Sequence, residues 1–229
     1  MRHFLSIFLL LVSCYGFAGW SEEKREDPSK YISAQVLFDK KKEMVYVLVL
    51  FQSNEKNNLH RPWIWDAGFQ LYRPDMTRAE ETFTVVWRNP DEPGKYDIWV
   101  WGSDRSTGMR YADDMFAEEK DGKIVLRFDE GQLAWEVAHP ENFEGEIVGR
   151  FRYMRPAGSA ADVSVEKDRY EKGFRIVMLK RALSTGNDDD LVLSETSEIY
   201  ITNRAPGELD FSLLEFRKIT EENMLWQKH

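Results

Sequence analysis

Residues 97–116, DIWVWGSDRSTGMRYADDMF, combine side chains that are well suited to holding a ligand. Trp99 and Trp101 alternate in a segment of strand type, a loop of small residues follows, and Met109 and Met115 come after it. Turns are ordinarily built from Gly, Asn, Asp and Pro, while large apolar residues stay in the strands. Two aromatic rings and two thioethers around one loop are therefore unusual for a turn, and a ligand site would account for them.

Common catalytic and metal-binding motifs are missing from the sequence. It has no Gly-rich phosphate loop ending in Lys-Ser or Lys-Thr, no GxSxG elbow, no HExxH and no CxxCH. Only His60 and His139 remain once the N-terminal His3 and the terminal His229 are set aside, which excludes a three-histidine zinc site. No local signature marks a nucleophile–base pair, and 40 acidic residues make any glycosidase pair arbitrary. These absences narrow the field of candidate reactions, and the family resemblance described below implies a protein that is not itself an enzyme.

Residues 185–191, TGNDDDL, offer neighbouring carboxylates of the kind that hard cations such as Ca²⁺ prefer. The segment lacks the regular ligand spacing and the glycine of the known calcium loop. We therefore predict a solvated hairpin turn here, with a calcium loop as the weaker alternative.

Length and composition predict one packed domain. The chain has 229 residues, of which 42% are hydrophobic and 14% aromatic, so it can form a substantial core. Broad aromatic rings favour strands, because they pack well on pleated surfaces. The formal net charge of −9 argues against nucleic-acid binding and suits a soluble protein or one that meets a basic partner surface.

Short apolar segments separated by turn signals are typical of a sandwich or barrel. The tail 218–229 is expected to form at most one or two helical turns, and 129–146 a short helix or a loop. We therefore expect an all-β protein, an antiparallel β-sandwich with minor helical segments. The predicted strands are 44–51, 82–88, 96–101, 123–128, 146–153, 174–181, 198–203 and 210–216.

The N-terminus has the composition of a secretory signal peptide, with a basic start, an apolar run over 4–12 and small residues after it. Cleavage after Ala18 is the favoured interpretation, which assigns residues 1–18 to the signal and 19–229 to a single periplasmic domain. Residues 11–14, LVSC, also resemble a lipobox, and only lipidation at Cys14 would attach the protein to a membrane. Because Cys14 is the one cysteine, the mature chain has no disulfide and no thiolate metal site.

Four segments resemble the haem-binding subunit family of ethylbenzene dehydrogenase and related molybdenum enzymes of the dimethyl sulfoxide reductase group. The most specific part is the block from Asp-Ile-Trp-x-Trp at 97–101 to Ala-Asp-Asp at 112–114. The family's Arg-Pro-Leu is Arg-Ala-Leu at 181–183 here. The resembling segments are AQVLFDKKKEMVYVLVLFQ (34–52), HRPWIWD (60–66), YDIWVWGSDRSTGMRYADD (96–114) and FRIVMLKRALSTGNDDD (174–190).

The resemblance implies an immunoglobulin-like or DOMON-like β-sandwich in the periplasm that holds haem b non-covalently between its sheets. Methionine and lysine are the axial ligands in the family, and electrons pass to or from an iron–sulfur subunit; a cytochrome is the other redox partner we expect. Carried over, it implies that Trp99 and Trp101 wall the macrocycle and that Met109 reaches the iron. Met115 is a second choice for the thioether and Met76 a third, while core packing is the ordinary role of any of the three.

The resemblance also implies a lysine ligand, for which Lys180 is the candidate, and an arginine for a haem propionate, Arg181. Lys180 lies at period two with Ile176 and Met178, so it shares a face with apolar residues. If Lys180 points inward, its buried ammonium group needs a neutralising partner or a metal, because an unpaired buried charge is costly. The alternative is that Lys180 lies near the strand end and its side chain reaches water. His60 is a competing ligand, although a surface role is favoured for it.

Two further functions remain open on the sequence. One is a non-redox module that binds a carbohydrate or another small ligand on a platform of Trp63, Trp65, Trp99 and Trp101. The other is a haem-free envelope scaffold. A platform requires exposed tryptophans in a groove, whereas the haem site requires space for a porphyrin beside Met109.

Overall fold

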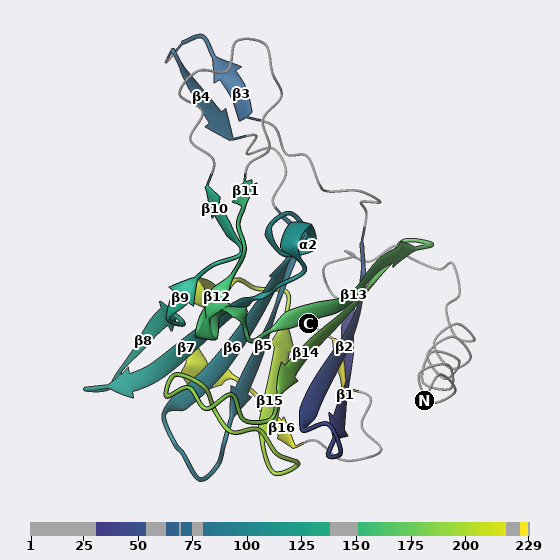
Figure 1. Cartoon of the computed structure of the whole chain (residues 1–229), viewed down its shortest axis with the longest axis vertical. Coiled ribbons are helices and arrows are strands. Elements are labelled where there is room, and N and C mark those ends of the chain that lie inside the picture. The colour runs from purple at the N-terminus through teal and green to yellow at the C-terminus, as the bar shows by residue number, and fades with distance from the viewer. Residues whose placement is uncertain are drawn as a thin grey trace.

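The computed structural model describes residues 31–53, 63–68, 70–74, 80–137, 151–218 and 225–228 (Figure 1). The predicted signal peptide at 1–18 with Cys14, and the candidates His60, Met76 and His139, lie outside these residues. Within the described ranges no helix is long and apolar enough to cross a membrane. One domain over 19–229 stays a prediction.

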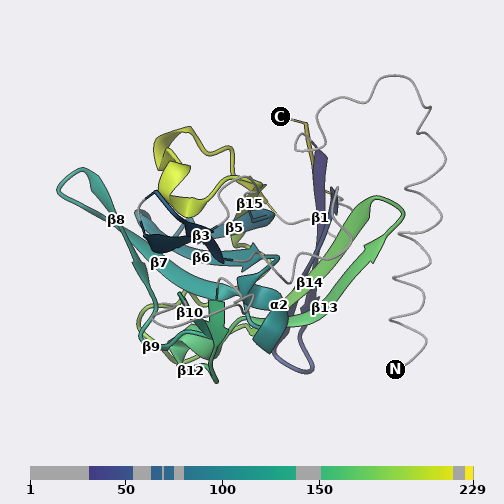
Figure 2. The ribbon, with the colours of Figure 1, turned by 90° about the horizontal axis from the view of Figure 1, so that it is seen from above.

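Two antiparallel sheets pack face to face as a sandwich, which confirms the all-β prediction (Figures 1 and 2). The first has five strands in the order β13 (Ser164–Glu171), β14 (Phe174–Ala182), β2 (Met44–Gln52), β1 (Tyr31–Asp39) and β17 (Leu225–Lys228). The second has six in the order β16 (Arg217–Lys218), β15 (Glu198–Thr202), β5 (Thr82–Arg88), β6 (Lys95–Gly102), β7 (Asp113–Lys120) and β8 (Lys123–Phe128).

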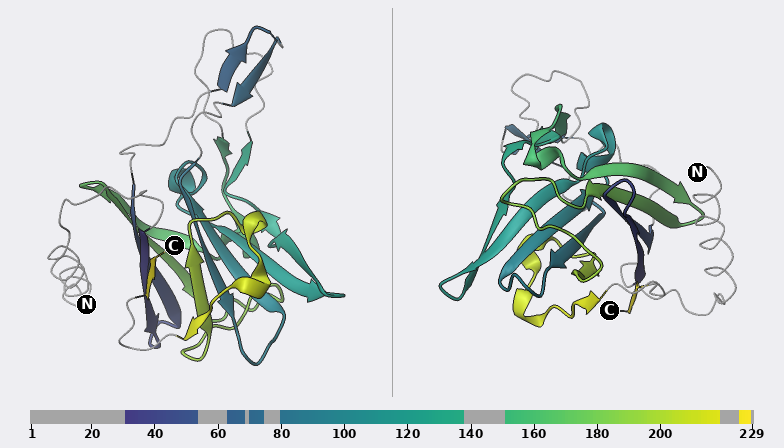
Figure 3. Two further views of the ribbon diagram at one scale, coloured as in Figure 1. Left: turned by 180° about the vertical axis from the view of Figure 1, so that it is seen from behind. Right: turned by 60° about the horizontal axis from the view of Figure 1, so that its bottom comes forward.

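Several small elements decorate the sandwich. The short helix α2, the β10–β11 pair and the β3–β4 pair lie at one end of it (Figures 1 and 3). The small elements are α2 (Arg105–Met109), β3 (Trp63–Asp66), β4 (Leu71–Pro74), β9 (Gly131–Gln132), β10 (Trp135–Val137), β11 (Phe151–Tyr153), β12 (Ala157–Gly158), and the 3₁₀ turns η2 (Ser159–Ala161), η3 (Pro206–Glu208) and η4 (Phe211–Leu213).

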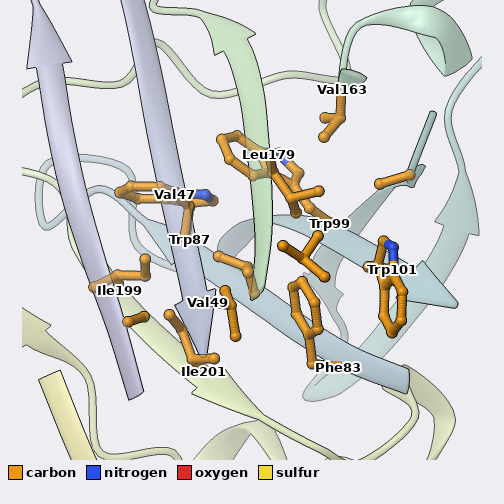
Figure 4. Packing of buried hydrophobic residues seen from close by; sticks show 14 of the residues in the cluster. Val47, Val49, Phe83, Trp87, Trp99, Trp101, Val163, Leu179, Ile199 and Ile201 are labelled. Atoms are coloured by element: carbon orange, nitrogen blue, oxygen red, sulfur yellow. The ribbon is translucent and has the colours of Figure 1, made fainter. Parts of the chain in front are cut away.

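The main core lies between the sheets and is built by alternate residues of the strands. Side chains two positions apart point to the same face of a strand, so Trp99 and Trp101 of β6 both enter the core. They meet Phe83 and Trp87 of the neighbouring β5 and Leu179 of the facing sheet (Figure 4). This cluster excludes water from the space between the two sheets.

A second apolar cluster covers the outer face of the six-stranded sheet. It contains Ile98 and Met115, which are directly opposite each other on β6 and β7, and Phe211 of η4. Strand β6 is therefore buried on both faces, which explains why its sequence is almost continuously apolar between Asp97 and Gly102. The C-terminal segment that carries η4 covers this face.

Most predicted strands are confirmed with ends within two residues: 44–51, 82–88, 96–101, 123–128, 174–181 and 198–203. Of 146–153, only 151–153 is described, as β11. The strand predicted at 210–216 is wrong, because Asp210 caps a 3₁₀ turn there by accepting a hydrogen bond from the Ser212 amide. Residues 225–228 are extended rather than helical, because they pair with the edge of β1.

Candidate functional site

Trp99 and Trp101 are core residues, not the walls of a ligand site. Both side chains are fully buried, and Trp101 stacks on Phe83 with ring centroids 5.4 Å apart (Figure 4). Trp99 lies 5.3 Å from Trp87 by the same measure. Because their ring faces are occupied by protein groups, the structure corrects the expectation that this pair walls a haem between the sheets. It equally removes both residues from a sugar-binding platform.

The structure places Lys180 and Arg181 on opposite faces of β14. Ile176 and Met178 do share the face of Lys180, but it is the outer face of the five-stranded sheet. There Lys180 is 31% exposed and forms an ion pair with Glu166 at 2.9 Å. The expectation of an inward lysine ligand is therefore corrected, because the core face of this strand carries Val177, Leu179 and Arg181.

Met109 and Met115 lie in different parts of the structure. Met115 is buried in the outer apolar cluster of the six-stranded sheet, so it is a packing residue and not a second ligand candidate. Met109 is half-buried and ends α2, where Arg110 takes a left-handed conformation with φ 64° and stops the helix. Met109 is thus the one candidate thioether of this block at the α2 end of the sandwich.

The α2 end carries an aromatic hairpin, formed by Trp135 of β10 with Phe151 and Tyr153 of β11. The rings of Trp135 and Phe151 meet edge to face at 4.9 Å. Tyr153 donates a hydrogen bond from its hydroxyl to the Asp104 carbonyl at 2.7 Å and keeps 38% of its surface exposed. Gly108 lies so close to the Tyr153 ring that a Cβ built on it would be 2.5 Å away. Helix α2 is therefore docked on this hairpin.

Arg105 connects α2 to the hairpin. Its Nε lies 3.1 Å from Asp113, and its guanidinium carbon lies 5.6 Å from the Trp135 ring centroid. Trp135 Nε1 also donates to Asp113. Burial raises the pKa of the Asp113 carboxyl, and the charge of Arg105 opposes that rise.

A second cluster of polar side chains lies at the edge of the main core and includes part of 185–191, the segment predicted as a solvated hairpin turn with a calcium loop as the weaker alternative. We call it the carboxylate cluster. Asp97 comes from β6, Asp114 from β7 and Asp129 from the residue after β8, while Asp189 and Asp190 belong to the connection between β14 and β15. The connection therefore is not a fully solvated turn, although its neighbour Asp188 is exposed.

Arg181 lies within this cluster and is fully buried. Its Nη1 donates to Asp97 and, at 2.6 Å, to Asp190, while Nη2 donates to the Leu191 carbonyl at 2.6 Å. Thr185 adds a hydroxyl donor to Asp190 at 2.7 Å. The expected role of Arg181 toward a haem propionate is therefore corrected, since aspartate carboxylates occupy its donors.

Ligand-type oxygens in the cluster approach one another closely. One carboxylate oxygen from each of Asp97, Asp114 and Asp190 lies within 4.8 Å of the others, and the same holds for Asp129, Asp189 and Asp190. Asp189 also accepts from the Ser159 hydroxyl at 2.8 Å and the Glu130 amide at 3.0 Å. Asp190 belongs to both groups and joins them into one cluster.

Burial and mutual repulsion disfavour the charged form of these carboxylates. Burial raises the pKa of Asp97 to about 6 and that of Asp129 to about 8, and neighbouring carboxylates add to both shifts. Burial and the charges of Asp97 and Asp129 raise the pKa of Asp114 well above its ordinary value. Burial opposes the charge on Arg181, but the surrounding aspartates outweigh it and raise the pKa of this guanidinium.

The sequence held two signals for this cluster, the neighbouring carboxylates of residues 185–191 and the position of Asp97. Asp97 lies at period two with Trp99 and Trp101, so a chain that buries both rings must also bury Asp97. A buried carboxylate needs a partner.

No family model matches this sequence, and no curated protein matches it significantly.

Proposed function

We propose that this chain is a periplasmic electron-transfer protein that binds haem b at the α2 end of its sandwich. The observation that carries the proposal is the position of Met109, half-buried at the end of a helix that is docked on the aromatic hairpin. The resemblance of residues 97–114 to haem-binding subunits supports it from the sequence. Catalysis would belong to a partner enzyme.

The residues fit a haem at this end better than between the sheets. Met109 offers a thioether, and the rings of Trp135, Phe151 and Tyr153 offer the apolar and aromatic contacts that a macrocycle needs. Lys180 faces away on the outer surface, so we assign it no axial role.

Each of these side chains has a physical task in the proposed site. When bound, the haem iron supplies one-electron redox chemistry, and a methionine ligand favours a higher potential. Arg105 is already paired with Asp113 and Glu80, so its task is to hold α2 against the hairpin and not to bind a propionate. The net charge of −9 suits a redox partner with a basic docking surface, which we expect to be an iron–sulfur subunit or a cytochrome.

The first test is an absorption spectrum of the mature protein exported to the periplasm of a haem-sufficient host. We expect a Soret band that sharpens and shifts on reduction with dithionite. Met109→Ala should shift or abolish this band, because it removes the axial thioether. Met76→Ala is the control and should leave the spectrum unchanged. The reverse behaviour of the two variants would show that Met109 is not the ligand.

A non-redox binding module is the second candidate function, favoured by the exposure of Tyr153 and of Phe128 beside Trp135. These rings take the place of Trp99 and Trp101 in the platform that was predicted together with Trp63 and Trp65. A colourless protein that also fails to bind added haemin would put this function, or a scaffold without a small ligand, ahead of electron transfer.

A further inference from the structure

The carboxylate cluster carries more negative charge than its guanidinium can balance. Within the described parts of the chain, Arg181 is the basic group that forms ion pairs with the cluster, against the five carboxylates described above. Like charges within 4.8 Å of one another repel strongly in a medium of low dielectric constant. The fold therefore needs further positive charge at this point.

The oxygens that lack a partner point to where that charge belongs. Both carboxylate oxygens of Asp114 are buried without a hydrogen-bond donor, and its side chain has no exposed surface. The same holds for both oxygens of Asp129, which is 5% exposed, and for Oδ1 of Asp97. Buried polar atoms in native proteins are almost always satisfied, so these five oxygens call for a bound group that accepts their lone pairs.

Arg181 does not fill this role. Its donors are directed to Asp97, Asp190 and the Leu191 carbonyl, which leaves Asp114 without a donor. The guanidinium instead holds Asp97 and Asp190 in place. Oδ1 of Asp97 has no donor, and each oxygen of Asp190 accepts one hydrogen bond, from Arg181 or Thr185, and keeps a further lone pair. These oxygens can then act with Asp114, since one oxygen from each of the three residues lies within 4.8 Å of the others.

We propose that a calcium ion binds in the carboxylate cluster, with Asp97, Asp114 and Asp190 as ligands and Asp129 and Asp189 beside them. Ca²⁺ takes roughly six to eight oxygen ligands at about 2.3–2.6 Å, a shell that these carboxylate spacings can form. All the grouped side chains offer oxygen, which favours a hard cation over zinc or copper. Several carboxylates on separate segments suit Ca²⁺ better than the rigid octahedron of Mg²⁺.

The ion would join parts of the chain that are distant in sequence. Asp97 and Asp114 belong to adjacent strands of the six-stranded sheet, whereas Asp190 lies in the connection that crosses from β14 of one sheet to β15 of the other. Calcium would therefore fix this crossover against the sheet. The site does not depend on haem, and it goes beyond electron transfer.

The test is thermal unfolding of the mature protein, dialysed against EDTA and then titrated with CaCl₂. We expect saturable binding of one Ca²⁺ by calorimetry and a rise in Tm of about 5–10 °C at saturation, since a ligand that binds only the folded state stabilises it. MgCl₂ at the same concentration should give a smaller rise. An equal Mg²⁺ effect would overturn the assignment to calcium.

Asp114→Asn is the decisive variant, because the side chain of Asp114 makes no hydrogen bond that the change could break. The amide is neutral without taking up a proton and adds donors toward neighbouring carboxylates, so the variant in EDTA should unfold at a higher temperature than wild type. The same change should abolish the calcium-dependent rise. Asp188→Asn, in the same connection but exposed and outside the cluster, is the matched control and should keep the full rise.

The outcomes are distinct from those of the haem test, since they are read from unfolding and calorimetry rather than colour. A calcium effect that is present in wild type and Asp188→Asn but lost in Asp114→Asn supports the site. No calcium effect in wild type, or an equal effect in all three proteins, overturns it and leaves protons as the balancing charge.

Discussion

At the scale of single residues, Lys180 and Arg181 show how one step along a strand separates two environments. Lys180 reaches the surface and pairs with Glu166, whereas Arg181 is enclosed by aspartates with no exposed surface. An exposed ion pair contributes little, because water and salt screen it. A buried arginine with buried partners is different, since its removal leaves uncompensated charge in the core.

Arg181→Met should lower the free energy of unfolding by about 3–5 kcal/mol, the range for breaking a buried ion pair. Lys180→Gln, one residue away, should lower it by less than about 1 kcal/mol. Urea unfolding followed by tryptophan fluorescence measures both, at pH 7 and without added metal. A larger loss for Lys180→Gln than for Arg181→Met would contradict the assignment of inner and outer faces on β14.

At the scale of elements, the docking of α2 on β11 sets the geometry of the proposed haem site. Helix α2 spans only five residues and has no side-chain N-cap, so little holds it except its neighbours. The close approach of Gly108 to Tyr153 and the contacts of Arg105 supply that hold. The position of Met109 therefore depends on the aromatic hairpin.

Gly108→Ala should destabilise the protein, although alanine is intrinsically about 1 kcal/mol better than glycine inside a helix. The new Cβ would meet the Tyr153 ring at 2.5 Å and push α2 from the hairpin. In a Tyr153→Ala background the same change should become neutral or stabilising. A double-mutant cycle by urea unfolding measures the coupling, and additive effects would show that helix and hairpin are independent.

At the scale of the whole molecule, buried acidic groups lie where the two sheets and their crossover meet. In the folded protein without a bound cation, the pKa values of these carboxyls are raised, so the carboxyls keep their protons to a higher pH. In the unfolded chain, aspartate carboxyls release their protons at about pH 4. A group whose folded pKa is raised stabilises the fold at low pH and loses that contribution as pH rises through the folded pKa.

The stability of the protein in EDTA should therefore fall as pH rises from 5 to 8.5. The window follows from the pKa of Asp97 at about 6 and that of Asp129 at about 8. The groups that face Asp129 are Asp97, Asp189, Asp190 and Arg181. Asp129→Asn should flatten the upper part of the profile. Urea unfolding at several pH values measures it, and a rise in stability across this window would contradict the prediction.

How much the sequence predicts depends on how local the determining interaction is. Strands such as 82–88 and 123–128 have the same bounds in the sequence prediction and in the structure, since period-two patterning and flanking turns are local signals. The strand predicted at 210–216 is wrong because a cap at Asp210 decides that segment, and residues 225–228 are extended because they pair with the edge of β1. Helix α2 was missed for lack of a strong helical pattern over five residues.

The sequence by itself determined the all-β class, most of the core strands and the candidate ligand side chains of residues 97–114. Only the tertiary structure decided which face of each strand is the inner one, and so separated Arg181 from Lys180 and Met109 from Met115. It also brought Asp97, Asp114 and Asp190 together across long separations in sequence. Alternation along a strand is fixed by the backbone, but the face that is buried is chosen by what packs against it.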